Sequence, residues 1–128
     1  MKESNFQLIG KSKVNSMSYE TNKKFNFTDE LPLEISNNVQ IIRCEDVHSE
    51  EAIVVLEIGI FVSKEFENVP FKISMEIEGH FRWNDILKEN EKLLATMLQS
   101  NAPAILYGYL RPLITLITVE ANMPPLVI

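Results

Sequence analysis

The segment from Phe71 to Trp83, FKISMEIEGHFRW, constrains the fold most, because it alternates between apolar and polar side chains. Successive side chains of a β-strand point to opposite faces, so this segment has one apolar and one polar face. The apolar face reads Phe71, Ile73, Met75, Ile77, Phe81 and Trp83. Only Gly79 interrupts that set, and a glycine inside a strand often marks a β-bulge. The chain therefore contains a sheet with one buried face, and other apolar residues must cover that face.

Three further segments have the composition of strands, which predicts four strands at roughly 6–20, 33–45, 50–63 and 69–83. The first is long and largely polar, as expected of an edge strand. The third is apolar on both faces, which favours a central position in the sheet. Short connections join the last three segments and predict an antiparallel meander.

The hydrophobic period changes after Asn84 from two residues to the helical value of about 3.6. We expect helices at roughly 85–99 and 102–120, with Asn84 as the N-cap of the first. The polar sequence QSNAP separates them, and Asn101 is the expected N-cap of the second. The predicted fold class is therefore α+β, a four-stranded antiparallel sheet with two C-terminal helices packed on one face.

The second predicted helix, NAPAILYGYLRPLITLIT, is apolar on nearly every side. In a membrane, Arg111 and Pro112 would lie near the bilayer centre, where an arginine costs about 3 kcal/mol or more. We therefore expect no stable membrane insertion, and we expect Pro112 to kink this helix or to remove one hydrogen bond.

A chain of 128 residues is expected to form one domain, 1–128. Within one domain, helices can cover the apolar face of the sheet only once, so the remaining apolar helix surface stays uncovered. The surplus of apolar surface predicts association with other copies or with a partner.

Composition argues against several classes of function. The net charge of −6 disfavours nucleic acid, because phosphate binding requires clustered Lys and Arg. Cys44 is the only cysteine and the N-terminus has no long apolar signal, so a reducing, cytoplasmic location is expected. His48 and His80 each lack further ligands at metal spacing, which predicts no metal site. The sequence has no nucleophile motif and no glycine-rich phosphate loop, so we expect neither an enzyme nor a bound cofactor.

Four stretches occur in an order that resembles the SecB-type protein-export chaperones. They are FQLI followed by SMSYE, then EGHFRW, then NAPAILYGYLRPLITLIT, and finally MPPLVI. The resemblance covers nearly the whole chain. It implies a SecB-like fold that assembles into a homotetramer through its first helices. It also implies ATP-independent binding of unfolded client polypeptides in long apolar grooves.

The resemblance implies roles for particular residues. Client contacts are expected from the loop after the first strand and from the second helix, at Phe25, Phe27, Leu31 and Tyr107. Oligomer contacts are expected from the fourth strand and the first helix, at Ile73, Met75, Ile77, Leu87 and Leu94.

In this family, acidic residues on the outer sheet face dock on the SecA translocation ATPase, and Glu20 matches one such position. Ser16, Lys72 and Ser74 depart from the family pattern there, and the acidic C-terminal tail typical of export members is missing. SecA is therefore one expected partner, and an antitoxin bound by a dedicated chaperone is the other.

Two alternatives belong to other classes of function. One is an oligomeric small-ligand-binding or thioesterase-like domain, which would need a closed pocket with converging polar groups. The other is a purely structural oligomerisation module, which would leave no apolar surface uncovered in the assembly.

Overall fold

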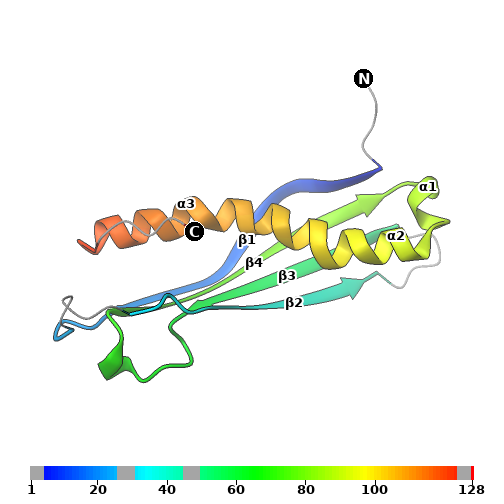
Figure 1. The fold of residues 1–128 in the computed structure, drawn as a ribbon. Coiled ribbons are helices and arrows are strands. Elements are labelled where there is room, and N and C mark those ends of the chain that lie inside the picture. The colour runs from blue at the N-terminus through cyan, green and yellow to red at the C-terminus, as the bar shows by residue number, and fades with distance from the viewer. Residues whose placement is uncertain (1–4, 26–30, 45–49, 124–127) are drawn as a thin grey trace.

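The computed structural model describes residues 5–25, 31–44, 50–123 and 128. Four strands form one antiparallel sheet (Figure 1): β1 (Phe6–Thr21), β2 (Ile35–Arg43), β3 (Glu51–Ile60) and β4 (Phe71–Trp83). The sheet order is β1-β4-β3-β2, and a short 3-10 helix, η1 (Phe66–Asn68), lies between β3 and β4. The predicted meander of the last three strands and the predicted fold class are confirmed. The long polar β1 lies at one edge, as predicted, and β2 lies at the other.

The inner face of the sheet, which the long helix covers, carries the apolar residues of β3 and β4. The register pairs Leu56 with Ile77 and Ile58 with Met75, so these four side chains share one face. None of the four is more than 3% exposed. Cross-strand apolar pairs of this kind are the unit from which a sheet core is built. The opposite, outer face carries the polar residues of β4.

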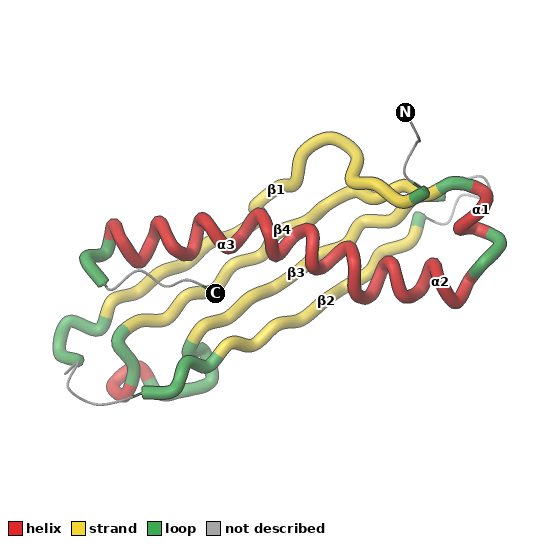
Figure 2. Tube along the Cα trace, turned by 45° about the horizontal axis from the view of Figure 1, so that its top comes forward, coloured by secondary structure: helices red, strands yellow, loops and turns green. Residues whose placement is uncertain are grey.

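The irregularity predicted at Gly79 is present on its β1 side, where the pairing passes from Ile9–His80 to Lys13–Glu78, whereas Gly79 pairs regularly with Val54 of β3. The irregularities lie in β1, between Ile9 and Lys13 and again near Val14. Gly10, in the first of them, has a φ of +68°, a conformation that glycine adopts without strain. Figure 2 shows β1 arching away from the sheet at this point.

The helical region is arranged differently from the prediction. It consists of α1 (Asp85–Lys88), α2 (Glu91–Thr96), a π-helical turn η2 (Met97–Asn101) and α3 (Ala102–Glu120). Asn84 caps α1 as predicted, because its side chain accepts a hydrogen bond from the Leu87 amide.

The break between helices falls at Asn90 and not at QSNAP. The Asn90 side chain accepts a hydrogen bond from the Leu93 amide at 3.1 Å and caps α2. Asn101 has helical angles and makes no side-chain capping bond among the described residues. Pro103 lacks the amide that an α-helix would use there, and the π turn directly before it lets the helix continue. The result is one helix from Glu91 to Glu120.

This 30-residue helix is long and apolar enough to cross a membrane by length and composition alone. The core helix of a soluble fold meets the same criterion, and Figure 1 shows α3 lying across the sheet. Residues at a spacing of four face the sheet and are buried, namely Ala102, Leu106, Leu110, Ile114 and Thr118. Only 33% of the most apolar window is buried, however, so much apolar helix surface is left uncovered. The helix continues through Pro112, which is exposed.

Candidate functional site

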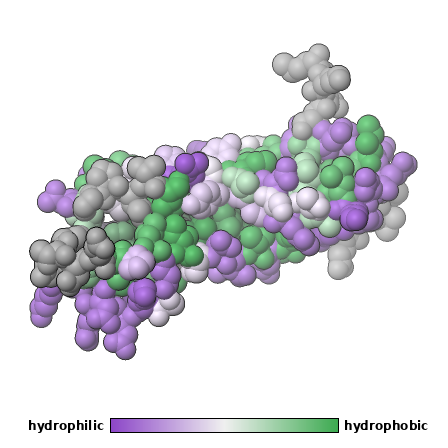
Figure 3. All heavy atoms as spheres, viewed as in Figure 1, coloured by the Kyte–Doolittle hydropathy of each residue, from purple (hydrophilic) through white to green (hydrophobic). Residues whose placement is uncertain are grey.

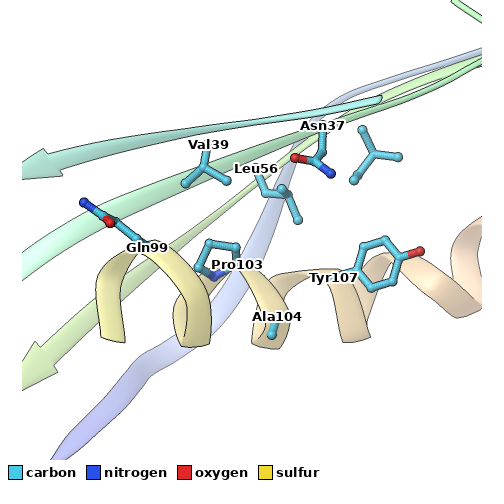
Figure 4. A pocket seen from close by; sticks show the side chains of 8 residues that line it. Asn37, Val39, Leu56, Gln99, Pro103, Ala104 and Tyr107 are labelled. Atoms are coloured by element: carbon cyan, nitrogen blue, oxygen red, sulfur yellow. The ribbon is translucent and has the colours of Figure 1, made fainter. Parts of the chain in front are cut away.

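A groove of about 330 Å³ lies between the helix and the inner face of the sheet near β2 (Figure 4). Strand residues form one wall, and residues of η2 and α3 form the other. The lining residues are Asn37, Val39, Leu56, Ile58, Gln99, Pro103, Ala104 and Tyr107. Figure 3 shows apolar surface exposed between α3 and the sheet on this side of the molecule.

The groove exists because α3 lies over β3, β4 and β1 and leaves the inner face of β2 partly uncovered. Every residue of β2 is half-buried or exposed, whereas seven of the ten residues of β3 are buried. Val39 of β2 is half-buried and points into the space beside the helix. Ala104 is too small to fill that space from the helix side, so an apolar floor stays open to solvent.

Polar groups are few in this groove. They are the side-chain amides of Asn37 and Gln99 and the hydroxyl of Tyr107. An apolar surface with a few amide and hydroxyl groups suits an extended polypeptide, since pockets take side chains and amides bond to peptide groups. An extended chain placed here would also lie next to β2, which pairs only with β3 among the described strands.

The structure brings one of the predicted client-contact residues into the groove, and that residue is Tyr107. The described residues that line the groove do not include Phe25 or Leu31. Phe25 is half-buried and its amide donates to the Asn22 carbonyl, while Leu31 packs against the core. Phe27 lies outside the described residues. Val39 was not among the predicted client contacts, although the alternating apolar face of β2 was a usable signal for it.

The residues predicted at an oligomer interface are buried within the single chain. Ile73, Met75, Ile77, Leu87 and Leu94 are each at most 3% exposed and belong to one core cluster. Their side chains leave no surface for a second subunit, so any effect on assembly has to act through the core. Their role in assembly stays a prediction. The exposed apolar residues of α1 and α2 are instead Ile86 and Leu93, at 70% and 47%.

Glu20, the predicted SecA contact, lies near the end of β1 on the outer face. It is exposed and pairs in register with Lys72 of β4. Nearby on the same face, Asn15 donates hydrogen bonds to Glu76 and Glu78 at 2.9 and 2.7 Å. The surroundings of Glu20 are therefore mixed in charge, and its role in docking stays a prediction.

The expectation that His80 has no neighbouring ligands is wrong. Cys44, Glu51 and His80 offer three ligand atoms that lie within 4.8 Å of one another on the outer face. The hydrogen bonds that Arg82 donates to Glu51 hold the pKa of that carboxyl below its ordinary value. Sequence spacing could not reveal this cluster, because strand pairing brings the three residues together. His48 lies outside the described residues.

The architecture is a single sheet layer crossed by one long helix, with an open apolar groove between them, and this defines a SecB-like fold. A SecB-like chaperone from Mycobacterium tuberculosis, Rv1957, solved with a peptide of the HigA1 antitoxin, superposes with a TM-score of 0.70. The superposition covers 97% of this chain and 86% of that one at 13% identity, so it shows a shared fold.

The family model of preprotein translocase subunit SecB matches residues 2–128, and the chain belongs to that family. A protein of unknown function from Streptococcus agalactiae has a similar fold, with a TM-score of 0.53, 16% identity and 98% of each chain covered. An uncharacterized protein of Methanocaldococcus jannaschii is 30% identical over 87 residues. That match covers 68% of this chain and 54% of the relative, so this chain spans about half of it.

Proposed function

We propose that the protein is an ATP-independent chaperone that binds non-native polypeptides in the groove beside α3. The observation that carries this proposal is the open apolar groove of about 330 Å³ in a chain of the SecB family. Family membership supports a chaperone role. The Mycobacterium protein of the same fold binds an antitoxin peptide, which supports polypeptide as the ligand.

The geometry supports a binding mode in two parts. An extended client segment would place apolar side chains on Val39, Leu56 and Tyr107, which lie on three different elements. Its peptide groups would bond along the edge of β2 that β3 does not use, in the manner of an added strand. Main-chain bonds of this kind do not depend on client sequence, so one site can bind many clients.

A homotetramer in the cytoplasm is part of the proposal. Apolar side chains are exposed on the inner face of β1 and on α3, at Val14, Met17, Ile105, Tyr109 and Leu116, each between 38% and 54% exposed. Contact between copies would cover surface of this kind and would join short grooves into longer ones. Many weak contacts along one client then add up.

Two classes of client are proposed for this groove, namely preproteins awaiting export and a dedicated antitoxin. SecA docking through Glu20 would mark the export role. The small-ligand alternative receives no support, because the groove is open and its polar groups are two amides and a phenol.

The experiment that tests the proposal measures how the protein delays aggregation of a reduced, unfolded model polypeptide. Ala104→Glu places a charged side chain in the groove from an exposed helix position, which preserves the fold. Burying that charge against a client is unfavourable, so we expect at least tenfold weaker protection. The matched control is Ala95→Glu, at an exposed position of α2 that does not line the groove.

Light scattering of the same samples gives the mass with and without client. Wild-type protein and Ala95→Glu are expected to form a tetramer that gains the mass of a client, and Ala104→Glu a tetramer that does not. Equal protection by both variants would show that clients bind elsewhere.

A further inference from the structure

Cys44 and Glu51 face each other at one end of the sheet. Cys44 directly follows β2, and Glu51 is the first residue of β3. The register pairs Arg43 with Ala52, and the Cys44 amide donates to the Glu51 carbonyl at 3.2 Å. Cys44 is therefore opposite Glu51, and paired residues of antiparallel strands point to the same face. Both side chains lie on the outer face, away from the helix and the groove.

His80 reaches the same place from β4. The register pairs Glu51 with Arg82, so His80 is the diagonal neighbour of Glu51 on the outer face. Its Nε2 lies 2.9 Å from Oε2 of Glu51. The thiol, the carboxylate and the imidazole thus meet from three strands, with their ligand atoms within 4.8 Å of one another.

We propose that Cys44, Glu51 and His80 form a binding site for a divalent transition metal ion of the zinc type. Thiolate, imidazole and carboxylate are the three ligand types that zinc takes from proteins. Ligand atoms around tetrahedral zinc lie about 3.3 to 3.6 Å apart, as the metal–ligand bond lengths require. To reach that geometry, the 2.9 Å between Nε2 of His80 and Oε2 of Glu51 has to widen slightly, and the longer separations, up to 4.8 Å, have to shorten, which side-chain rotation allows.

The neighbours of the cluster support a metal ion in two ways. Arg82 donates from Nε and Nη2 to Oε1 of Glu51, at 3.1 and 3.0 Å, while Oε2 contacts Nε2 of His80, so a metal ion would replace that contact and bind both atoms. Carboxylates that bind metals are commonly oriented by such outer hydrogen bonds. The side chains of Glu51 and His80 are 27% and 42% exposed, so the ion has access from solvent and a fourth position is open to water.

The site would join the ends of β2 and β3 to β4 at the outer face. Metal that binds only the folded chain stabilises it by mass action. The proposal does not rest on the chaperone function, because the cluster and the groove lie on opposite faces of the sheet.

Cobalt binding by the full chain tests this proposal. The protein is prepared without a histidine tag, reduced, freed of metal with a chelator and titrated with Co²⁺. We expect one Co²⁺ per chain and a thiolate-to-cobalt charge-transfer absorption in the near ultraviolet. Zn²⁺ should displace the cobalt and raise the melting temperature.

Variants identify the ligands. Cys44→Ser should abolish the charge-transfer absorption, and His80→Gln and Glu51→Gln should each weaken binding at least tenfold. The matched control is His48→Gln, which removes the other histidine and should bind like the wild type. All three ligand positions are at the surface of the outer face, and circular dichroism of each variant confirms its fold.

Three results would overturn the proposal. One is a wild-type titration without the charge-transfer absorption. Another is unchanged affinity in Cys44→Ser. The third is a loss in His48→Gln that equals the loss in His80→Gln, which would mark general surface binding.

Discussion

Side chains of β1 and of the long helix approach the backbone of Gly79 in β4 closely. A Cβ atom at this position would lie 2.8 Å from Cδ1 of Leu8 and 2.9 Å from Cδ2 of Leu106. The sequence marks Gly79 as the one gap in an apolar alternation, and a bulge was a reasonable expectation from that gap. Extra residues of β1 do lie opposite Gly79, and the glycine also permits the close approach of two leucines, which residue spacing alone does not reveal.

Gly79→Val should therefore destabilise the fold, although valine favours strands. The added side chain overpacks the core, and we expect a loss of about 1 to 3 kcal/mol in the free energy of unfolding by urea. The matched control is Gly108→Ala in α3, where a Cβ would meet no described atom within 4 Å. Alanine there should stabilise the helix by about 0.5 to 1 kcal/mol. A neutral Gly79→Val would show that the leucines move aside at no cost.

At the scale of elements, the strands and their faces were predictable, because alternation depends only on the local sequence. The helical break was not. Asn90 and Asn101 are both plausible caps by residue type, and Pro103 made the second more attractive. The π turn absorbs the proline and keeps the helix continuous, and no simple sequence period marks such a turn. The groove could be expected at the second helix through Tyr107, and the alternating face of β2 indicated Val39, but the sequence did not indicate that the helix leaves this face open.

The two asparagines give a direct test of where the helix begins. Asn90→Ala removes the side chain that accepts the Leu93 amide, and we expect a loss of about 0.5 to 2 kcal/mol in stability. Asn101→Ala should change stability little, because Asn101 is exposed and lies inside the continuous helix. The measurement is chemical denaturation of both variants. A larger loss of stability for Asn101→Ala would show that a helix begins at Asn101, after a break at QSNAP.

At the scale of the whole molecule, the surplus of apolar surface was correctly expected, but the residues that carry it were not. Family resemblance indicated the fourth strand and the first helix for assembly, and those positions form the core of the single chain. Exposed apolar residues lie along the inner face of β1 and the flank of α3, and in the first predicted helix they are Ile86 and Leu93, not the predicted Leu87 and Leu94. Which apolar residues are covered depends on where the helix crosses the sheet, and only the tertiary structure fixes that.

Assembly through the β1 flank predicts different effects for two neighbouring residues. Met17 pairs with Met75 on the inner face and is 49% exposed, whereas Ser18 pairs with Ser74 on the outer face. Met17→Asp would bury an unpaired charge between subunits, so light scattering should show at least a halving of the mass. Ser18→Asp should keep the mass of the wild type. If Met17→Asp also keeps it, the β1 flank is not a contact between copies.

The sheet order has a consequence for synthesis. Among the described strands, β1 pairs only with β4, from Thr21 with Phe71 to Phe6 with Trp83, so β1 leaves the ribosome before the other three strands and waits longest for its neighbour. At translation rates of about 5 to 20 residues per second, β1 waits roughly 3 to 10 s before β4 begins to emerge. During that interval the nascent chain exposes an unpaired extended strand. The protein thus passes through a state like that of the clients it is proposed to bind.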